Sequence, residues 1–393
     1  MSEVAATAQP TEAEAFHTDR VTTISIGHAV HDTYTAFLAP MLPVFIETLS
    51  LSKTEAGLLS VFNQAPSLLQ PVLGHLADRK DLRLLVVMTP AVTATTMSLL
   101  GVAPSYLVLA FLLMVTGLSS ATLHSIAPVI VGRLSGRHLG RGMGFWMVGG
   151  ELGRTLGPLI IVTAIQFLGL KGTPWLMVGG WLTSLLLAIR LWNVDVRPAG
   201  GSQGLPWRKA LRLMGPLLLP LLGIITVRAF MSSALTTYLP VFLTEEGAEL
   251  WFAGVSLSVL EAAGIVGALM GGSLSDRFGR RVVLLISLLI TPLLMLVFLA
   301  VGGWLRFPLL LMMGFTALSV TPVVMALVQE TFPENRALAN GLYMSTSFII
   351  RSGAIVALGA ASDLLGMRAA FLGSALVTLL GLPFILFLPA RQR

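Results

Sequence analysis

The chain has 393 residues, of which 55% are hydrophobic and 11% are charged, and its formal net charge is +6. A soluble domain carries roughly twice that charged fraction, so the composition argues against a soluble globular protein. There is no cysteine, which excludes disulfides and thiolate metal sites. Apolar runs of about 18 or more residues recur from Val21 to Leu388 without the period-two alternation of barrel strands. We therefore expect membrane-spanning helices.

The pattern predicts an all-α membrane protein with twelve transmembrane helices in two pseudo-symmetric six-helix halves. A polar N-terminal arm, residues 1–20, lacks the features of a cleaved signal peptide. The first half follows at 21–193, a linker rich in Pro and Gly at 194–213, and the second half at 214–393. The twelve spans are expected at 21–48, 54–77, 83–102, 105–131, 140–169, 173–192, 214–243, 251–274, 282–302, 306–329, 337–361 and 368–390.

The basic residues are distributed unevenly between the two sides of this topology. Of the 25 Lys and Arg residues, 18 fall on the side that holds both termini and four fall on the other side. The positive-inside rule then predicts that both termini, and the linker between the halves, lie in the cytoplasm, with the protein in the inner membrane. Because topology accounts for the pI of about 10.2, no nucleic-acid partner is expected.

The two halves repeat one another at a nearly constant offset, which indicates a parallel duplication of a six-helix unit. Three pairs of segments carry this signal: LPVF at 42–45 and 239–242 (239 − 42 = 197), GHLADRKDLR at 74–83 and GSLSDRFGRR at 272–281 (272 − 74 = 198), and GFWMVGGELGR at 144–154 and GLYMSTSFIIR at 341–351 (341 − 144 = 197).

The second pair has the form G-x-L-x-D-R-x-x-x-R, and together with twelve spans in two halves it resembles the major facilitator superfamily. The resemblance implies transport by alternating access, with these loops latching the cytoplasmic side shut in the outward-open state. Positive-inside anchoring alone is the alternative role. The first copy departs from the family in having Asp81 where Gly is common. The expected gate residues are Gly74, Asp78, Arg79, Arg83, Gly272, Asp276, Arg277 and Arg280.

Within that superfamily, GHAVHD, NQAPSLLQPVLGHLAD, GLSSATLH and MVGGELGRTLGP look like the fosmidomycin-resistance-type exporters. In those, the first helix typically carries a His and an Asp four residues apart, which His28 and Asp32 match. The chain departs from them at Glu151 and Arg154, and in having Ser125 rather than Pro after His124. These departures fall near the expected cavity, so the resemblance implies least about the identity of the substrate.

The fifth span also resembles the antiporter motif of the superfamily through Gly153, Gly157 and Pro158. The Gly-Gly that ends that motif is absent here, since Leu159 and Ile160 follow instead. Glycines four residues apart also allow two helices to pack closely for purely structural reasons. Close packing and an antiport-specific role therefore both remain open.

Ionisable residues inside the spans are the sharper signal, because each costs several kcal/mol in hydrocarbon unless it is paired or hydrated. Asp32 is the leading proton carrier, since burial favours its neutral form and a nearby Arg favours its charged form. His28 and His31 lie on the same helical face and are candidate relays. Packing roles for the histidines, a static Asp32–Arg154 pair and a Glu151–Arg154 pair are the alternatives. The proton-coupling candidates are Asp32, His28, His31 and Glu151.

A guanidinium suits a phosphonate, phosphate or carboxylate, so Arg228 and Arg351 are the main anion-binding candidates. By resemblance, the first, fourth and seventh spans line the cavity. The further substrate-binding candidates are Arg154, His124, Glu261 and Tyr34.

The sequence contains no nucleotide-binding loop, no metalloprotease motif and no cofactor fingerprint, so we expect neither an enzyme nor a bound cofactor or metal. The expected function is proton-coupled export of a small organic anion or amphipathic drug. Proton-coupled uptake of an organic anion is the alternative, and a membrane enzyme or scaffold is a remote one. The expected partners are a small-molecule substrate, protons and the lipid bilayer, and the protein is expected to be a monomer.

Overall fold

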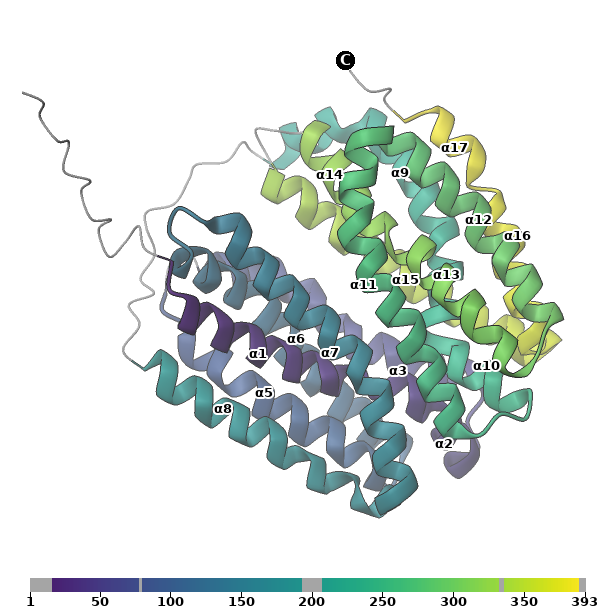
Figure 1. Ribbon diagram of the computed structural model, residues 1–393, viewed down its shortest axis with the longest axis horizontal. Coiled ribbons are helices and arrows are strands. Elements are labelled where there is room, and N and C mark those ends of the chain that lie inside the picture. The colour runs from purple at the N-terminus through teal and green to yellow at the C-terminus, as the bar shows by residue number, and fades with distance from the viewer. Residues whose placement is uncertain (1–15, 78–79, 193–206, 332–335, 389–393) are drawn as a thin grey trace, which may run out of the picture.

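The computed structural model describes residues 16–77, 80–192, 207–331 and 336–388. These residues are almost entirely helical and form two bundles that lie side by side, one from each half of the chain (Figure 1). Among them, ten helical segments are long and apolar enough to cross a membrane. The first two expected spans are present as broken helices, so the described chain is consistent with twelve spans.

The N-terminal bundle follows the expected spans closely. Its first span breaks after Thr35, and its second span passes into a 3-10 turn, Ala65–Leu69, with Pro66 near the start of that turn. The first helix already begins at Thr18, within the expected arm. The helices are α1 (Thr18–Thr35), α2 (Leu38–Leu49), α3 (Lys53–Gln64), η2 (Ala65–Leu69), α4 (Gln70–Ala77), α5 (Arg83–Ser98), η3 (Leu99–Val102), α6 (Tyr106–Leu134), α7 (Leu139–Leu168), η4 (Leu170–Leu176) and α8 (Met177–Leu191).

The C-terminal bundle repeats this order. Its first helix begins at Trp207, so the last part of the expected linker is helical. A π-helical turn interrupts the same span after Ser233, which is the position equivalent to the break after Thr35 (233 − 35 = 198). The helices are α9 (Trp207–Ser233), η5 (Ala234–Tyr238), α10 (Leu239–Glu245), α11 (Leu250–Phe278), α12 (Arg280–Ala300), η6 (Gly303–Leu305), α13 (Arg306–Leu318), α14 (Val320–Thr331), α15 (Arg336–Leu365), α16 (Met367–Leu379) and α17 (Leu382–Leu386).

A pair of arginines shows the duplication at the level of single contacts. Arg83 donates hydrogen bonds to the carbonyls of Leu191 (2.9 Å) and Trp192 (2.7 Å), where the last span of the first half ends. Arg281, 198 residues later, donates to the carbonyl of Leu386 (3.4 Å) at the end of the second half. Each loop arginine therefore holds the last span of its own half.

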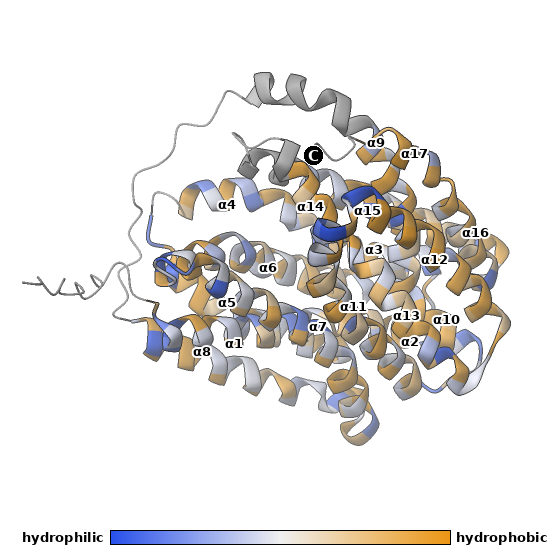
Figure 2. Cartoon of the chain, turned by 45° about the horizontal axis from the view of Figure 1, so that its top comes forward, coloured by the Kyte–Doolittle hydropathy of each residue, from blue (hydrophilic) through white to orange (hydrophobic). Residues whose placement is uncertain are grey.

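Large apolar side chains cover the outside of both bundles. Leu107, Phe167, Trp175 and Leu364 are each more than three-quarters exposed, at 78%, 77%, 77% and 84%. Hydrophobic residues run along most of the helix lengths, as Figure 2 shows. Apolar surface on this scale is not left to water, so the chain is an integral membrane protein.

The two bundles are joined most tightly at one end, which we call the closed end. There a single hydrophobic core takes Phe45 and Leu59 from the first half and Phe242 and Ile355 from the second. The other two core clusters each belong to one half only. Away from the closed end, the bundles diverge (Figure 1).

Polar contacts reinforce the closed end. Asp363 accepts hydrogen bonds from the backbone N–H groups of Lys53 (2.8 Å) and Thr54 (3.0 Å) and from the Thr54 hydroxyl (2.6 Å). The Tyr238 hydroxyl lies 3.1 Å from the carbonyl of Lys53 and 3.0 Å from that of Ile355. One acid and one tyrosine of the second half thus hold the N-terminus of α3 in the first.

Candidate substrate and coupling site

Two histidines and an aspartate meet inside the first half, and we call them the His–Asp cluster: His28 and Asp32 on α1 and His124 on α6. The Nε2 atom of His28 lies 3.1 Å from Nε2 of His124 and 3.3 Å from Oδ2 of Asp32. The Nε2 atom of His124 lies 3.6 Å from Oδ1 of Asp32. His31, fully buried, contacts the same Oδ1 through Nδ1 at 3.0 Å. The sequence spacing that placed three of these residues on one face thus agrees with the structure.

Backbone carbonyls orient the two imidazoles of the cluster. Nδ1 of His28 lies 2.8 Å from the carbonyl of Trp146, and Nδ1 of His124 lies 2.9 Å from that of Ser120. A carbonyl only accepts, so both Nδ1 atoms donate and carry hydrogen. The His28 ring also stacks on Trp146, with centroids 3.6 Å apart and planes 14° apart. Both rings therefore turn Nε2 toward Asp32.

A seam of glycines on α7 brings that helix against α1. A Cβ atom on Gly149, Gly153 or Gly157 would collide with the carbonyl oxygens of successive turns of α1, namely those of Ser25, Ala29 and Thr33. The same seam buries the cluster, because a Cβ on Gly150 would lie 2.7 Å from Nε2 of His28. Close packing by these glycines is thus observed.

Arg154 on α7 connects the first half to the second. It forms an ion pair with Glu151 on its own helix, one turn away. It also lies 3.7 Å from Oδ2 of Asp32 and 4.0 Å from Oε2 of Glu261 on α11. Arg154 is therefore shared among three carboxylates, with Glu151 the nearest.

A cavity of about 790 Å³ lies between the halves. His124 of α6, Arg228 of α9 and Arg351 of α15 line it. No residue of α1 does, although the first span was expected to line the cavity. Its described lining residues include two arginines and no carboxylate. They are Gln64, Ser67, Leu68, Gln70, Pro71, Gly74, His124, Ser125, Ile225, Arg228, Ala229, Ser232, Thr321, Tyr343, Met344, Ser345, Ser347, Phe348 and Arg351.

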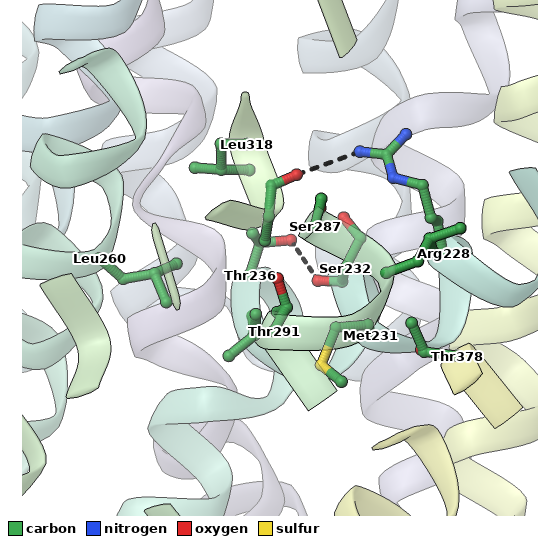
Figure 3. A pocket seen from close by; sticks show the side chains of 12 residues that line it. Arg228, Met231, Ser232, Thr236, Leu260, Ser287, Thr291, Leu318 and Thr378 are labelled. Carbon is green, nitrogen blue, oxygen red and sulfur yellow. Dashed lines mark hydrogen bonds between the residues drawn. The ribbon is translucent and has the colours of Figure 1, made fainter. Parts of the chain in front are cut away.

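The two cavity arginines are only partly occupied by protein partners. Arg228 donates through Nη2 to the carbonyl of Ala317 at 3.1 Å, beside a small void of about 20 Å³ lined by both hydroxyl and apolar side chains (Figure 3). Arg351 donates through Nη2 to the Thr236 hydroxyl at 2.9 Å, and its buried Nε has no hydrogen-bond partner. Hydrogen-bonding capacity therefore remains on both guanidinium groups.

The family model of the Major Facilitator Superfamily matches residues 24–354 and 252–393, which together span nearly the whole described chain. The chain belongs to the Major Facilitator Superfamily. It is thus a membrane transporter of small molecules and not an enzyme, and the sequence-based prediction of this family and fold is confirmed.

Individual relatives agree with this assignment. The transporter is 26% identical over 381 residues to an uncharacterized MFS-type transporter of Bacillus subtilis (strain 168), and 24% identical over 380 residues to the fosmidomycin resistance protein of Escherichia coli (strain K12). Each alignment covers 94% of this chain and 92% of the relative. A bacterial homolog of the human lysosomal transporter Spinster, solved in an inward-facing and unoccupied conformation, has a similar fold. Its TM-score is 0.77 at 14% identity, covering 95% of this chain and 96% of that one.

Several other predicted site residues of this transporter lie away from the cavity. Tyr34 is buried and donates its hydroxyl to the carbonyl of Leu176. In the loop motifs, Arg83 contacts Asp81 and the end of α8, and Arg280 pairs with Asp276 at 2.6 Å. Both sets of contacts stay within one half. Two further gate residues, Asp78 and Arg79, lie outside the described residues.

Two features were not predicted from the sequence: the contacts of Asp363 and Tyr238 with the start of α3, and the carbonyl groups that orient the histidines. Ser52 and Glu55 form a capping box that marks the start of α3, and this signal was available in the sequence. Nothing in the sequence indicated that Asp363, more than 300 positions away, would cap the same helix. The carbonyl of Trp146 carried no signal, because backbone groups are the same in every residue.

Proposed function

We propose that this transporter exports a small organic anion by alternating access in exchange for protons. The observation that carries the proposal is the central cavity, whose described lining has two arginines, several hydroxyl groups and no carboxylate. A guanidinium in such a cavity binds phosphonate, phosphate or carboxylate through paired N–H groups. The volume of about 790 Å³ lies within the range of sites for small organic ligands.

In this proposal Asp32 carries the proton. Arg154 lies between Asp32 of the first half, at 3.7 Å, and Glu261 of the second, at 4.0 Å. A charged Asp32 attracts Arg154, and a neutral Asp32 leaves it to Glu151 and Glu261. Protonation thereby changes an electrostatic link between the halves, which is the coupling that an antiporter needs. His28 and His31, in contact with Asp32, are the proposed relays.

The proposed orientation places both termini, and the open end of the cavity, in the cytoplasm of an inner-membrane monomer. The charge count of 18 basic residues against four supports this orientation. The cavity would then load substrate from the cytoplasm, as export requires. The name of the Escherichia coli relative, a fosmidomycin resistance protein, supports export as the direction. The loop residues Gly74, Arg83, Gly272 and Arg277 are proposed to close the cytoplasmic side later in the cycle.

A binding screen tests the substrate class. Purified protein is titrated with phosphonates, carboxylates and cationic drugs, and binding is followed by thermal shift and calorimetry. We expect anions to stabilise the protein, and Arg228→Ala or Arg351→Ala to weaken anion binding about 10–100-fold, the range for a charged hydrogen-bond donor. Arg190→Ala, on the exposed face of α8, removes the same charge and should change nothing. Stabilisation by cationic drugs alone would overturn the proposal.

Vesicles with imposed pH gradients test the direction of coupling. For an antiporter, a proton gradient drives the identified anion in the direction opposite to proton flow. Anion movement in the same direction as the protons would instead show uptake by symport. If the rate and direction of transport do not depend on the pH gradient, the proposal of proton coupling is wrong.

A further inference from the structure

The His–Asp cluster brings three electron-pair donors to one point. Both Nδ1 atoms donate to backbone carbonyls, so the neutral imidazoles of His28 and His124 have their lone pairs on Nε2. Asp32, when ionised, is also acceptor-only. These three groups face one another at 3.1, 3.3 and 3.6 Å. Acceptors this close repel one another unless a proton or a metal ion lies among them.

The separations match those expected around a tetrahedral metal ion. Zinc binds histidine nitrogen and carboxylate oxygen at about 2.0–2.2 Å, so two of its ligand atoms lie about 3.3–3.5 Å apart. The two Nε2 atoms lie 3.1 Å apart, and each lies close to a different oxygen of Asp32, Oδ2 at 3.3 Å from His28 and Oδ1 at 3.6 Å from His124, so the observed separations bracket that value. Two histidines and one carboxylate form a ligand set that proteins use for zinc and related first-row ions.

The outer contacts of the cluster are also those of a metal site. Metal-binding histidines usually donate their second ring nitrogen to a carbonyl or carboxylate, which fixes the ring and its tautomer. Here the carbonyls of Trp146 and Ser120 do so at 2.8 and 2.9 Å. The stacked indole of Trp146 holds the His28 ring further in place. The donors are therefore oriented in advance.

The surrounding charges accept one more positive group. Asp32, Glu151 and Glu261 contribute three negative charges, while Arg154 and the nearby Arg351 contribute two positive ones, which leaves −1. Glu151 pairs with Arg154 and draws its charge away from the cluster. His124 also lines the cavity, so an ion held by three protein ligands would have its fourth position open to water or substrate.

We propose that His28, Asp32 and His124 form a binding site for one divalent first-row metal ion of the Zn²⁺ type. The sequence did not predict this site, because His124 lies 96 residues from His28 on another helix. It stands on geometry and is independent of the proposed transport function. Since the ion occupies the same lone pairs as a proton, bound Zn²⁺ is an inhibitor wherever the cluster takes part in coupling.

Cobalt binding to the full-length protein tests the site. The protein is purified in detergent, freed of any affinity tag and stripped of metal, and Co²⁺ is added while the visible absorption of four-coordinate Co²⁺ is recorded. We expect one equivalent to bind and Zn²⁺ to displace it. His28→Ala and His124→Ala should each weaken binding by at least about 100-fold, because even the outer-shell partners of metal ligands are worth about 10–100-fold.

Matched controls separate this site from surface binding. His75 and His138 are exposed and lie outside the cluster, so the double variant His75→Ala/His138→Ala should keep one equivalent with unchanged affinity. The His124→Ala variant keeps the test usable if His28→Ala does not fold, since the His124 side chain is already 32% exposed. Binding lost only in the double control, or no binding at all, overturns the proposal.

Transport in vesicles gives a separate result for each proposal. Inhibition by Zn²⁺ that disappears in His124→Ala would support both the metal site and the coupling role of the cluster. One bound equivalent with unimpaired proton-driven transport would leave the metal site standing and overturn the coupling role. Absence of metal binding together with transport that depends on Asp32 would overturn the metal site and leave the coupling role of the cluster standing.

Discussion

The two halves of the transporter descend from one repeat, yet they treat their central charges differently. On α7, glycines let the helix lie against α1 and bury the His–Asp cluster. The equivalent helix α15 has larger side chains at those places, packs less extensively on α9, and leaves its arginine on the cavity. The equivalent pairs, all 197 residues apart, are Gly149 and Thr346, Gly153 and Ile350, and Gly157 and Ala354.

The acids differ in the same way. Arg154 and Arg351 are equivalent (351 − 154 = 197), but the position of Glu151 is taken by Phe348 and that of Asp32 by Ala229. Arg154 is therefore surrounded by carboxylates, while Arg351 donates to a hydroxyl group and borders the cavity. One repeat thus supplies two chemistries: a cluster with an excess of acid groups, suited to cations, and an arginine pair suited to anions.

The largest effect is expected from removing the acid that only the first half has. Asp32→Asn should reduce gradient-driven transport to that of vesicles without the protein, because no other acid among the described residues contacts both His28 and His124. Anion binding should change by less than about tenfold, since Asp32 does not line the cavity. Radiolabelled transport and calorimetry on the same preparation separate the two effects. Asp19→Asn, at the exposed start of α1, is the matched control, and normal transport by Asp32→Asn would remove its proton role.

The glycine seam offers the next largest effect, this time on stability. Gly153→Ala would place a Cβ 2.9 Å from both Cβ of Asp32 and the backbone nitrogen of Thr33, so α1 must move. Overpacking of this kind costs about 1–3 kcal/mol, which thermal unfolding in detergent will show as a lower midpoint. Gly144→Ala lies on the same helix with nothing within 4 Å and should be neutral or slightly stabilising. Equal melting of the two variants would mean that the seam does not hold α1.

The fold was largely predictable because its signals are long and repeated. Hydropathy located the spans, and three segments at one offset identified the duplication. The breaks after Thr35 and at η5 were not predicted, since the apolar composition continues through both. The break at Pro66 was not predictable either, since Pro43, Pro90 and Pro158 lie inside continuous helices.

The site was predictable only where its residues are close in sequence. Helical spacing put His28, His31 and Asp32 on one face, which the structure agrees with. The position of His124 against that face depends on how α6 packs on α1, and spacing along one helix contains no such information. For the same reason the sequence could not tell that no residue of α1 lines the cavity while Arg228 does.

The two halves contact each other most extensively at the closed end. Asp363→Asn should weaken its three hydrogen bonds to Lys53 and Thr54. A loss of about 1–2 kcal/mol shifts the equilibrium toward separation of this end roughly 5–30-fold. Asp276→Asn removes an acid whose described partner, Arg280, lies on its own half, and should leave this end closed.

Distances between spin labels measure that shift. The chain has no native cysteine, so labels can be placed at single introduced cysteines without other changes. Glu47 on α2 and Glu249 beside α11 are exposed and belong to different halves at the closed end. A longer distance between Glu47→Cys and Glu249→Cys is expected in Asp363→Asn only. An unchanged distance distribution would show that the apolar core alone keeps this end shut.

The smallest effect concerns an ion-pair group that only the second half has. Glu246, in the turn after α10, accepts hydrogen bonds from Nη2 of Arg306 at 3.0 Å and from Nη1 of Arg368 at 3.1 Å. The equivalent position in the first half is Leu49 (246 − 49 = 197), which cannot form such pairs. Partial burial acts to raise the pKa of this carboxyl, but the hydrogen bonds from the two arginines outweigh it and hold the pKa below its ordinary value of 4.5.

Because the folded-state pKa is depressed, the charged carboxylate stabilises the fold above pH 4.5, and this contribution is lost as the pH falls through the folded-state pKa. Glu246→Gln should therefore lower the free energy of unfolding near neutral pH by under about 1 kcal/mol, since the pair is partly exposed. This appears as a slightly lower unfolding midpoint. The difference from the unmodified protein should shrink as the pH falls below 4.5. Glu249→Gln, which removes the same charge from the same turn, should show no such trend. A gap that widens in acid would mean that Glu246 acts through something other than its two arginines.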